Sequence, residues 1–275
     1  MPTPELLGPE SLDALLGYAS LEPEMNIFIT GDVEQFGLSE PVNAYAMVSG
    51  DGSWDSVVVR FYGNYVVYSP NPLYDAGAVA DFIRAASGGQ RVLGSINGKL
   101  EVVGPLSNYF EESSLHTQYL ARCTSIIEGS VAPLDPGIEL RRVTEHEYGE
   151  LFALLGGMRA YRGLYDDPAS VAMATQQRIA NEARGCLTYG AFLDGEMVGT
   201  ASTGTATRDG AVIVGLGTRA DMRLEGIASA LVARLVEECL ADGKRFVCGF
   251  YRSRETGRLC ERLGFEPIGS YAMLY

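Results

Sequence analysis

One segment near the C-terminal end constrains the fold of this chain more than any other. It begins with the apolar run Val-Ile-Val-Gly-Leu-Gly-Thr at 212–218 and leads into Arg-Leu-Glu-Gly-Ile-Ala-Ser at 223–229. The apolar run predicts a buried strand. The residues that follow predict a helix over 226–241, whose apolar face is formed by Ile227, Leu231, Leu235 and Cys239. A helix start has N–H groups without partners inside the helix, so the turn between strand and helix is suited to an anion such as phosphate.

The strand before this turn contains Gly215 and Gly217, two residues apart. Glycines inside a strand often mark a bulge, which leaves backbone N–H and C=O groups unpaired. Such groups are able to bond an amide-bearing ligand. At the turn, Arg223 adds positive charge, Gly226 permits close approach of the backbone to a phosphate, and Ala228 keeps the first helical turn uncrowded. An amide-rich arm joined to a pyrophosphate describes coenzyme A.

Composition narrows the class of protein. Of the 275 residues, 47% are hydrophobic and 20% are charged, which predicts a packed globular protein. The start, Met-Pro-Thr-Pro-Glu, lacks the basic and apolar regions of a secretory signal, and no apolar run is long enough for a membrane span. The five cysteines are scattered without a Cys-x-x-Cys pair, and there are two histidines. We therefore expect a cytoplasmic protein with neither a metal site nor disulfides.

The negative charge is concentrated in the first half of the chain. The formal net charge is −14; residues 1–135 contain five Lys or Arg and 17 Asp or Glu, whereas residues 136–275 contain 16 and 18. Nucleic acid and anionic membranes would be repelled by such a surface, so neither is expected as a partner. A cationic partner is compatible with it, although solubility explains the charge more simply.

The expected domain boundary lies where the composition of the sequence changes. Residues 128–137, Glu-Gly-Ser-Val-Ala-Pro-Leu-Asp-Pro-Gly, include two prolines and two glycines, which disfavour a helix or a central strand. We interpret this segment as a linker between a first domain over 1–127 and a second domain over 138–275.

The second domain is expected to alternate strands with helices. A capping box at Thr144–Glu147 opens a helix, and the Asp194-Gly195 turn indicates a hairpin. The expected order is strand, two helices, three strands, helix, strand, helix, strand, which is an α+β fold with a mixed sheet. The expected strands are 138–143, 187–193, 197–206, 211–218, 246–251 and 264–275, and the expected helices are 148–155, 168–183, 226–241 and 255–263.

The first half repeats this order, which we interpret as a duplication of architecture. Its expected helices are 11–18, 23–35, 76–86 and 99–103, and its expected strands are 44–49, 56–62, 65–69, 91–93 and 117–123. At the place equivalent to the phosphate turn it has Pro-Asn-Pro-Leu-Tyr-Asp-Ala-Gly-Ala at 70–78. Because Asp75 would repel a pyrophosphate, the first half is expected to lack the anion site.

The second half resembles the GNAT acetyltransferases. Residues 216–231 are similar to the family's acyl-CoA signature, Arg/Gln-x-x-Gly-x-Gly/Ala, although Ala220 stands where the family often has proline. Residues 258–266, Arg-Leu-Cys-Glu-Arg-Leu-Gly-Phe-Glu, resemble the family's closing helix and its Leu-Gly-Phe turn. The resemblance covers about residues 138–275. It implies a GNAT-like acyl-CoA N-acyltransferase fold, with the first half as a degenerate GNAT-like copy or another α/β domain.

The resemblance also implies a cosubstrate and the residues that bind it. Acetyl-CoA would bind through the backbone of Leu216 and Thr218 at its pantetheine arm, and through the backbone amides of residues 224–229 at its pyrophosphate. Ser253 stands where the family often has a cofactor-contacting Asn. The full set of expected cofactor-binding residues is Leu216, Gly217, Thr218, Arg223, Leu224, Glu225, Gly226, Ile227, Ala228, Ser229 and Ser253.

For catalysis the resemblance implies direct transfer of an acetyl group to an amine. The backbone N–H of Leu216 would stabilise the oxyanion, a contribution typically worth about two to three orders of magnitude in rate. Cys260 stands where the family often has a tyrosine that protonates the departing thiolate, and we interpret Cys260 as core packing. Tyr251 or solvent would then be the acid. No general base is assigned among the available carboxylates Glu145, Glu196 and Asp209.

The acceptor would be an amine of a small molecule or a peptide. Residues 159–167, Arg-Ala-Tyr-Arg-Gly-Leu-Tyr-Asp-Asp, either border the acceptor site or form a solvated connector. Two alternatives stay open: a non-catalytic protein that binds acyl-CoA for regulation, and an interaction scaffold. The oligomeric state is open, with a dimer included.

Overall fold

The computed structural model describes residues 1–88 and 94–275 and divides into two compact units. The first unit contains residues 1–120 and 268–275, and the second contains residues 121–267. This division differs from the one expected from composition, because the whole segment 128–137 lies inside the second unit and the last strand lies in the first. The strand expected over 91–93 falls outside the described residues.

The first unit contains an antiparallel meander followed by a parallel pairing. Its strand order is β1-β2-β3-β4-β5-β12, in which β4 and β5 are parallel and the other neighbouring strands are antiparallel. Its elements are β1 (Thr3–Leu6), α1 (Leu12–Ala19), α2 (Ile27–Phe36), β2 (Val42–Val48), β3 (Trp54–Phe61), β4 (Asn64–Tyr68), α3 (Ala76–Ala86), β5 (Ile96–Lys99), α4 (Leu100–Leu106) and most of β6 (Leu115–Cys123) and β12 (Glu266–Leu274).

Alternating side chains of this sheet build a core on each of its faces. Val57 and Val59 of β3 pack in one cluster with residues of α1 and α2. Val58, which lies between them, packs in a second cluster with residues of α3 and α4. Strand side chains alternate between faces with a period of two, so a continuous apolar run predicts a strand covered on both sides.

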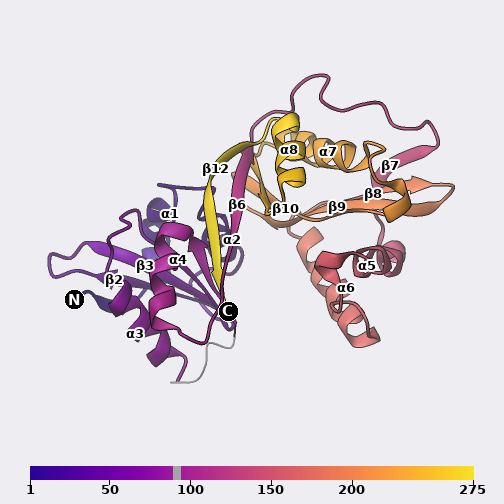
Figure 1. The fold of residues 1–275 in the computed structure, drawn as a ribbon. Coiled ribbons are helices and arrows are strands. Elements are labelled where there is room, and N and C mark those ends of the chain that lie inside the picture. The colour runs from indigo at the N-terminus through magenta and orange to yellow at the C-terminus, as the bar shows by residue number, and fades with distance from the viewer. Residues whose placement is uncertain (89–93) are drawn as a thin grey trace. The chain divides into compact units, whose positions relative to one another are not determined.

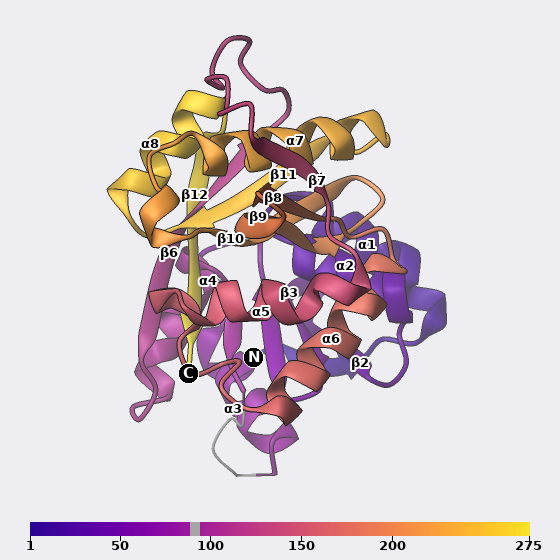
Figure 2. The ribbon, with the colours of Figure 1, turned by 90° about the vertical axis from the view of Figure 1, so that its right-hand side faces the viewer.

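The second unit contains a mixed sheet between two pairs of helices. Its strand order is β6-β11-β10-β9-β8-β7, with β10 and β11 parallel and β7 to β10 antiparallel. Helices α7 and α8 lie on one face of this sheet and helices α5 and α6 on the other (Figures 1 and 2). The elements are β7 (Ile138–Arg142), α5 (Tyr148–Gly156), α6 (Pro168–Glu182), β8 (Thr188–Leu193), β9 (Glu196–Ala206), β10 (Gly210–Thr218), α7 (Ile227–Ala241), β11 (Phe246–Tyr251) and α8 (Arg254–Leu263).

The two halves of the chain have the same element order, as expected, although the opening strand β1 of the first half was not among the expected elements. Each runs strand, two helices, three strands, helix, strand, helix, strand. The last strand of each half, however, extends across the division between the units: residues 121–123 of β6 belong to the second unit, and residues 268–274 of β12 belong to the first. An alternating pattern identifies a strand but does not name its partner, so the sequence kept residues 264–275 with the second half, whereas residues 268–275 lie in the first unit.

The described residues contain no helix with the length and apolar character needed to cross a membrane. Five cysteines, Cys123, Cys186, Cys239, Cys248 and Cys260, are buried. Cys239 lies at the end of the apolar face of α7, where Ile227, Leu231 and Leu235 are also buried, as their spacing predicted. Burial of Leu231 and of Leu235 each contributes about 1.5–3 kcal/mol to the free energy of folding. Helix α7 is therefore held against the sheet, and it fixes the end of the loop that precedes it.

Candidate functional site

Strand β10 has a bulge at its two glycines. Val214 is paired with Ser202 of β9 and Gly217 with Thr200, so three steps along β10 match two steps along β9. The extra residue is accommodated by Gly215, whose φ of +61° lies in the left-handed region that favours glycine. The bulge predicted from the spacing of the two glycines is therefore present.

Beyond Ile213, strand β10 also parts from its parallel neighbour. The pairing of β10 with β11 covers Gly210–Ile213 against Phe246–Gly249, while β10 remains paired with β9 as far as Thr218. Within the described residues, the pairings of 214–218 are thus made on the β9 side. The opposite edge of this segment presents backbone N–H and C=O groups that an amide-bearing ligand is able to bond.

The loop after β10 leads into an open helix start. Gly226 is the N-cap of α7, with a φ of +83°, and no side chain caps the helix among the residues that the structure describes. The first helical N–H bond of this turn is made by Ala230 to the Gly226 carbonyl, at 3.0 Å. The N–H groups of residues 227–229 precede it, at the positive end of the helix dipole. This arrangement suits a phosphate group.

Leu224 in the same loop has an unusual conformation. Its φ is +71° and its side chain is fully exposed. A left-handed leucine costs free energy, and strained residues of this kind cluster at ligand-binding loops. This strained residue lies in the loop that connects Arg223 to Gly226.

All eleven residues expected to bind the cofactor line one cavity of about 1290 Å³. Its wall contains four arginines and two glutamates, Arg159, Arg223, Arg258, Arg262, Glu225 and Glu255. The cavity is therefore positively charged although the chain as a whole carries a net charge of −14. Such a local excess attracts an anionic ligand. That these eleven residues hold coenzyme A stays a prediction.

Two features mark the β10 side of the cavity wall. The side chain of Met158 lies so close to Gly217 that a Cβ atom there would be 2.1 Å from its Sδ. A side chain at 217 would thus displace the end of the flexible Met158 side chain. Thr218 Oγ1 is buried and has no hydrogen-bond partner among the described residues. An unpaired buried hydroxyl costs free energy that a ligand hydrogen bond would recover.

Helix α8 contributes Glu255, Thr256, Arg258, Leu259 and Arg262 to the cavity wall. Ser253 is its N-cap and accepts a hydrogen bond from the Thr256 N–H at 3.1 Å. Arg262 Nη2 donates to Ser229 Oγ at 2.9 Å and so connects α8 to the first turn of α7. Ser253 therefore has a structural partner in addition to its place in the cavity wall.

Two parts of the wall were not assigned a cofactor-binding role from the sequence. Gly129, Ser130 and Ala132 come from the segment interpreted as a linker, and Leu134 lies 3.6 Å from the position of a Cβ atom on Gly226. Met158, Arg159, Ala160 and Tyr161 come from the end of α5 and the short 3₁₀ helix at Arg159–Tyr161. The Pro and Gly content of 128–137 correctly indicated irregular chain but carried no signal for a wall. The part of 159–167 that reaches the cavity is its first three residues.

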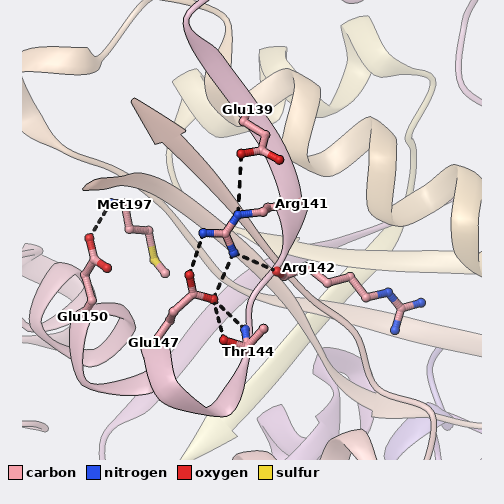
Figure 3. Close-up of polar contacts among 7 residues, drawn as sticks. All are labelled: Glu139, Arg141, Arg142, Thr144, Glu147, Glu150 and Met197. Carbon is pink, nitrogen blue, oxygen red and sulfur yellow. Dashed lines mark hydrogen bonds and ion pairs between the residues drawn. The ribbon is translucent and has the colours of Figure 1, made fainter. Parts of the chain in front are cut away.

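The position of α5 is fixed by contacts at its start (Figure 3). The predicted capping box is present, with Thr144 N–H and Oγ1 each 2.8 Å from Glu147 Oε2. Arg141 of β7 binds both oxygens of Glu147 at 2.6 and 3.0 Å, and this lowers the pKa of Glu147 to about 2. Glu150 of α5 accepts a hydrogen bond from the Met197 N–H of β9. These contacts attach α5, and with it Met158, to the sheet.

Comparison with known proteins identifies the second half. The model of the acetyltransferase (GNAT) family matches residues 157–265. Residues 157–265 are therefore similar in sequence to the GNAT family. The match includes both segments on which the resemblance was based, the Arg-x-x-Gly-x-Ala turn and the Leu-Gly-Phe turn. No curated protein matches this chain.

Solved structures extend the likeness to the whole chain. A tandem GNAT protein from the clavulanic acid biosynthesis pathway aligns with 99% of this chain and 98% of its own, at 15% identity and a TM-score of 0.66. A GNAT N-acetyltransferase from Sphaerobacter thermophilus covers 99% and 94%, at 16% identity and 0.62. A GNAT-like protein from Streptococcus suis covers 96% and 98%, at 17% and 0.57. The TM-scores and the coverage of both chains establish the fold, which is tandem and GNAT-like as expected.

The positions considered for acid catalysis in the second half lie outside the cavity wall as the structure describes it. Cys260 is 7% exposed in the core with Leu263 and Phe265, and burial raises the pKa of its thiol to about 11. This placement agrees with core packing. The ring of Tyr251 covers Gly257 of α8, where a Cβ atom would be 2.8 Å from its Cε2. Among the described residues, neither side chain belongs to the cavity wall.

The carboxylates considered as bases have other surroundings. Glu196 forms an exposed ion pair with Arg219 at 3.1 Å, and the Asp209 carbonyl accepts the Arg245 N–H at 2.7 Å. Glu145 lies in the 3₁₀ helix Glu145–Glu147 before α5. None of the three belongs to the cavity wall as the structure describes it. The acidic side chains in that wall are Glu225 and Glu255, beside the phosphate-type turn and at the start of α8.

A tyrosine is present in the wall beside the bulge. The Gly215 N–H donates a hydrogen bond to the Tyr161 hydroxyl. Burial raises the pKa of Tyr161, and the bond from Gly215 opposes this rise. The ring of Tyr165 stacks on Tyr161 with centroids 6.5 Å apart. Tyr161 therefore holds its proton at neutral pH, next to the strand segment expected to bind the thioester.

Proposed function

We propose that this protein is an acyl-CoA-dependent N-acyltransferase that moves an acetyl group from acetyl-CoA to an amine. The observation that carries the proposal is the conjunction of the β10 bulge, the parting of β10 from β11 and the open start of α7 along one cavity. These features offer backbone groups to an amide arm and N–H groups to a pyrophosphate, in the order in which coenzyme A contains them. The GNAT match over the same residues supports it.

In this proposal each part of the wall has a separate task. The backbone of Leu216 and Thr218 bonds the pantetheine arm, and Thr218 Oγ1 supplies a further hydrogen-bonding group. The N–H groups of residues 224–229 surround the pyrophosphate, while Arg223 adds charge at the entrance. Acetyl-CoA supplies an activated acyl group, and the Leu216 N–H stabilises the oxyanion formed when the amine attacks.

The acceptor would enter on the side of the wall made by α5 and the 3₁₀ helix. Met158 and Tyr161 offer an apolar and an aromatic surface there, and Arg159 offers a charge. This supports an amine with an apolar portion, carried by a small molecule or a peptide. The acetyl group as the natural acyl donor and the identity of the amine are parts of this proposal.

Ligand-induced stabilisation tests the proposal. Thermal unfolding of the full chain is followed with acetyl-CoA, with CoA and with ATP as a control anion. Binding to the native state by acetyl-CoA at 100 times its dissociation constant stabilises by about 2.7 kcal/mol, so the unfolding temperature rises. Release of free CoA thiol is then measured with a panel of primary amines. An unchanged unfolding temperature with both acetyl-CoA and CoA contradicts the proposal.

A second function, non-catalytic binding of acyl-CoA, is favoured by one observation. The residue at the family's usual acid position, Cys260, is buried in the core with a raised pKa and is not part of the described wall. Strong stabilisation by acetyl-CoA, together with no thiol release across the amine panel, would support this function. Thiol release with any amine at a rate above hydrolysis would exclude it.

A further inference from the structure

We infer that Tyr161 is the proton donor to the departing CoA sulfur, in place of a residue on α8. The inference rests on the proposed function, since it assigns a role at the same cavity. It is independent of which amine is acetylated.

The first argument is position. Tyr161 lines the same cavity as Leu216, Gly217 and Thr218, the strand segment beside which the thioester would lie. Its hydroxyl oxygen accepts a hydrogen bond from the Gly215 N–H, one residue before Leu216. The oxygen is thus attached to the bulge itself. Because that bond uses the oxygen as acceptor, the hydroxyl proton is left to be donated elsewhere.

The second argument is rigidity. The Tyr161 N–H donates to the Met158 carbonyl at 3.1 Å, and the Leu164 N–H donates to the Tyr161 carbonyl at 3.1 Å. The ring of Tyr165 stacks on Tyr161 and itself packs on Phe152 of α5, with centroids 4.9 Å apart. Backbone and ring are both held, so the hydroxyl is presented in one place, as a proton donor requires.

The third argument is charge. The titratable groups whose charge acts on Tyr161 are Tyr165 and Arg178 of α6. No carboxylate is among them in the described structure. Burial keeps the hydroxyl protonated before transfer. After transfer, the phenolate is stabilised by the Gly215 N–H and by the positive charge of Arg178. The surroundings of Tyr161 therefore stabilise the neutral hydroxyl before transfer and the phenolate after it.

The step balances without a further reagent. The amine nitrogen bonds to the acetyl carbon, and the C–S bond then breaks with its electron pair going to sulfur. The proton of the Tyr161 hydroxyl passes to sulfur and gives the free thiol. The phenolate regains a proton that the amine nitrogen has lost, through water. Tyr161 thus starts and ends protonated.

The test measures the acidity of the bound CoA thiol, which needs no acceptor. Full-length protein is mixed with a smaller amount of CoA so that all CoA is bound. Iodoacetamide is added at a series of pH values, and the CoA adduct is quantified by mass spectrometry, which ignores protein thiols. A hydrogen bond from Tyr161 to the sulfur stabilises the thiolate. In Tyr161→Phe the apparent pKa of bound CoA is expected to rise by about one unit, a tenfold loss of thiolate at fixed pH.

Matched variants isolate the effect. Tyr165→Phe removes the hydroxyl of the stacked ring, which does not have the hydrogen bond from Gly215. Cys260→Ser changes the residue at the position of the family's usual acid. Neither should change the pKa of bound CoA. If Tyr161→Phe does not fold, 3-fluorotyrosine at 161 replaces it, because it keeps the shape of the ring while lowering the pKa of the phenol. The stronger hydrogen-bond donor should then lower the apparent pKa of the bound CoA thiol.

The outcomes separate the inference from the proposed function. Tight CoA binding with the same thiol pKa in wild type and Tyr161→Phe, or an effect as large in Cys260→Ser, overturns the inference and leaves the proposed function standing. Absence of CoA binding by the wild-type protein overturns both. Where an amine of the panel is acetylated, Tyr161→Phe should lower kcat by about 100-fold with little change in the KM for acetyl-CoA.

Discussion

The helix that follows the third strand of the meander begins differently in the two halves of this protein. In the second unit, α7 begins at Gly226 without a side-chain cap. In the first unit, α3 begins at Asp75, whose carboxylate accepts the Ala78 N–H at 2.9 Å, and the Asp75 N–H donates to Asp55 Oδ2 at 3.0 Å. The same structural position thus uses its own carboxylates in one unit and leaves its N–H groups to a ligand in the other.

The strands before these helices also differ, because the strand of the first unit stays paired and the strand of the second unit does not. Strand β4 pairs with β3 in unbroken register, and a Cβ atom on Gly98 of β5 would be 2.4 Å from the Val67 carbonyl of β4. Strands β4 and β5 therefore remain close to the end of β4. Strand β10 is bulged and leaves β11 after Ile213. The comparison teaches that a duplicated architecture keeps its fold while one copy closes the features that would bind a cofactor.

The largest expected effect concerns the left-handed glycine of the open helix start. Gly226→Ala should lose one or more backbone hydrogen bonds to the pyrophosphate, each worth about 1.5–3 kcal/mol, which corresponds to a roughly 10- to 100-fold weaker affinity for CoA. Isothermal titration calorimetry, with CoA titrated into the full chain, measures this change in affinity.

Gly243→Ala is the matched control. Gly243 ends the same helix with a φ of +90°, and a Cβ atom there would meet no atom within 4 Å. Both variants carry a left-handed alanine, at a cost of about 1–2 kcal/mol in stability. Equal CoA affinity in the two variants would contradict the assignment of Gly226 to the pyrophosphate.

A smaller effect is expected at the capped helix start of the first unit. Asp75→Ala removes the cap of α3 and should lower the free energy of unfolding by about 1 kcal/mol, as measured by urea denaturation. Asp75→Asn should keep most of that stability, since asparagine caps about as well. CoA affinity should be the same in all three proteins, and a change in it would place the first unit in the binding site.

The smallest effect concerns a capped helix start within the second unit. The folded pKa of Glu147, about 2, lies below its ordinary value of 4.5 because of Arg141. The ionised form therefore stabilises the folded state above about pH 4.5, and this contribution is lost as the pH falls toward 2.

Glu147→Gln should consequently reduce stability at pH 7 by up to about 1 kcal/mol, given the partial exposure of the pair. Denaturant titrations at pH 7, 4.5 and 2.5 should show the difference from wild type shrinking. A difference that stayed constant across this range would show that the charge of Glu147 contributes nothing.

The sequence by itself determined the local features of the fold and site. The glycine spacing predicted the β10 bulge, the residues after it predicted the start of α7, and the Thr144–Glu147 pattern predicted a capping box. All three depend on interactions between residues a few positions apart. The eleven residues that the family resemblance implied line one cavity, and ten of them are nearly continuous in the chain; that they bind coenzyme A stays a prediction.

Only the tertiary structure decided which distant segments meet. It placed Gly129, Ser130 and Ala132 in the cavity wall, most of β12 in the first unit, Cys260 in the core, and Tyr161 beside Gly215. These outcomes depend on strand pairing and on the packing of α5 against the sheet, between residues separated by tens of positions. A residue's own neighbours in sequence carry no trace of such contacts, because the free energy that selects them comes from burial of the whole core.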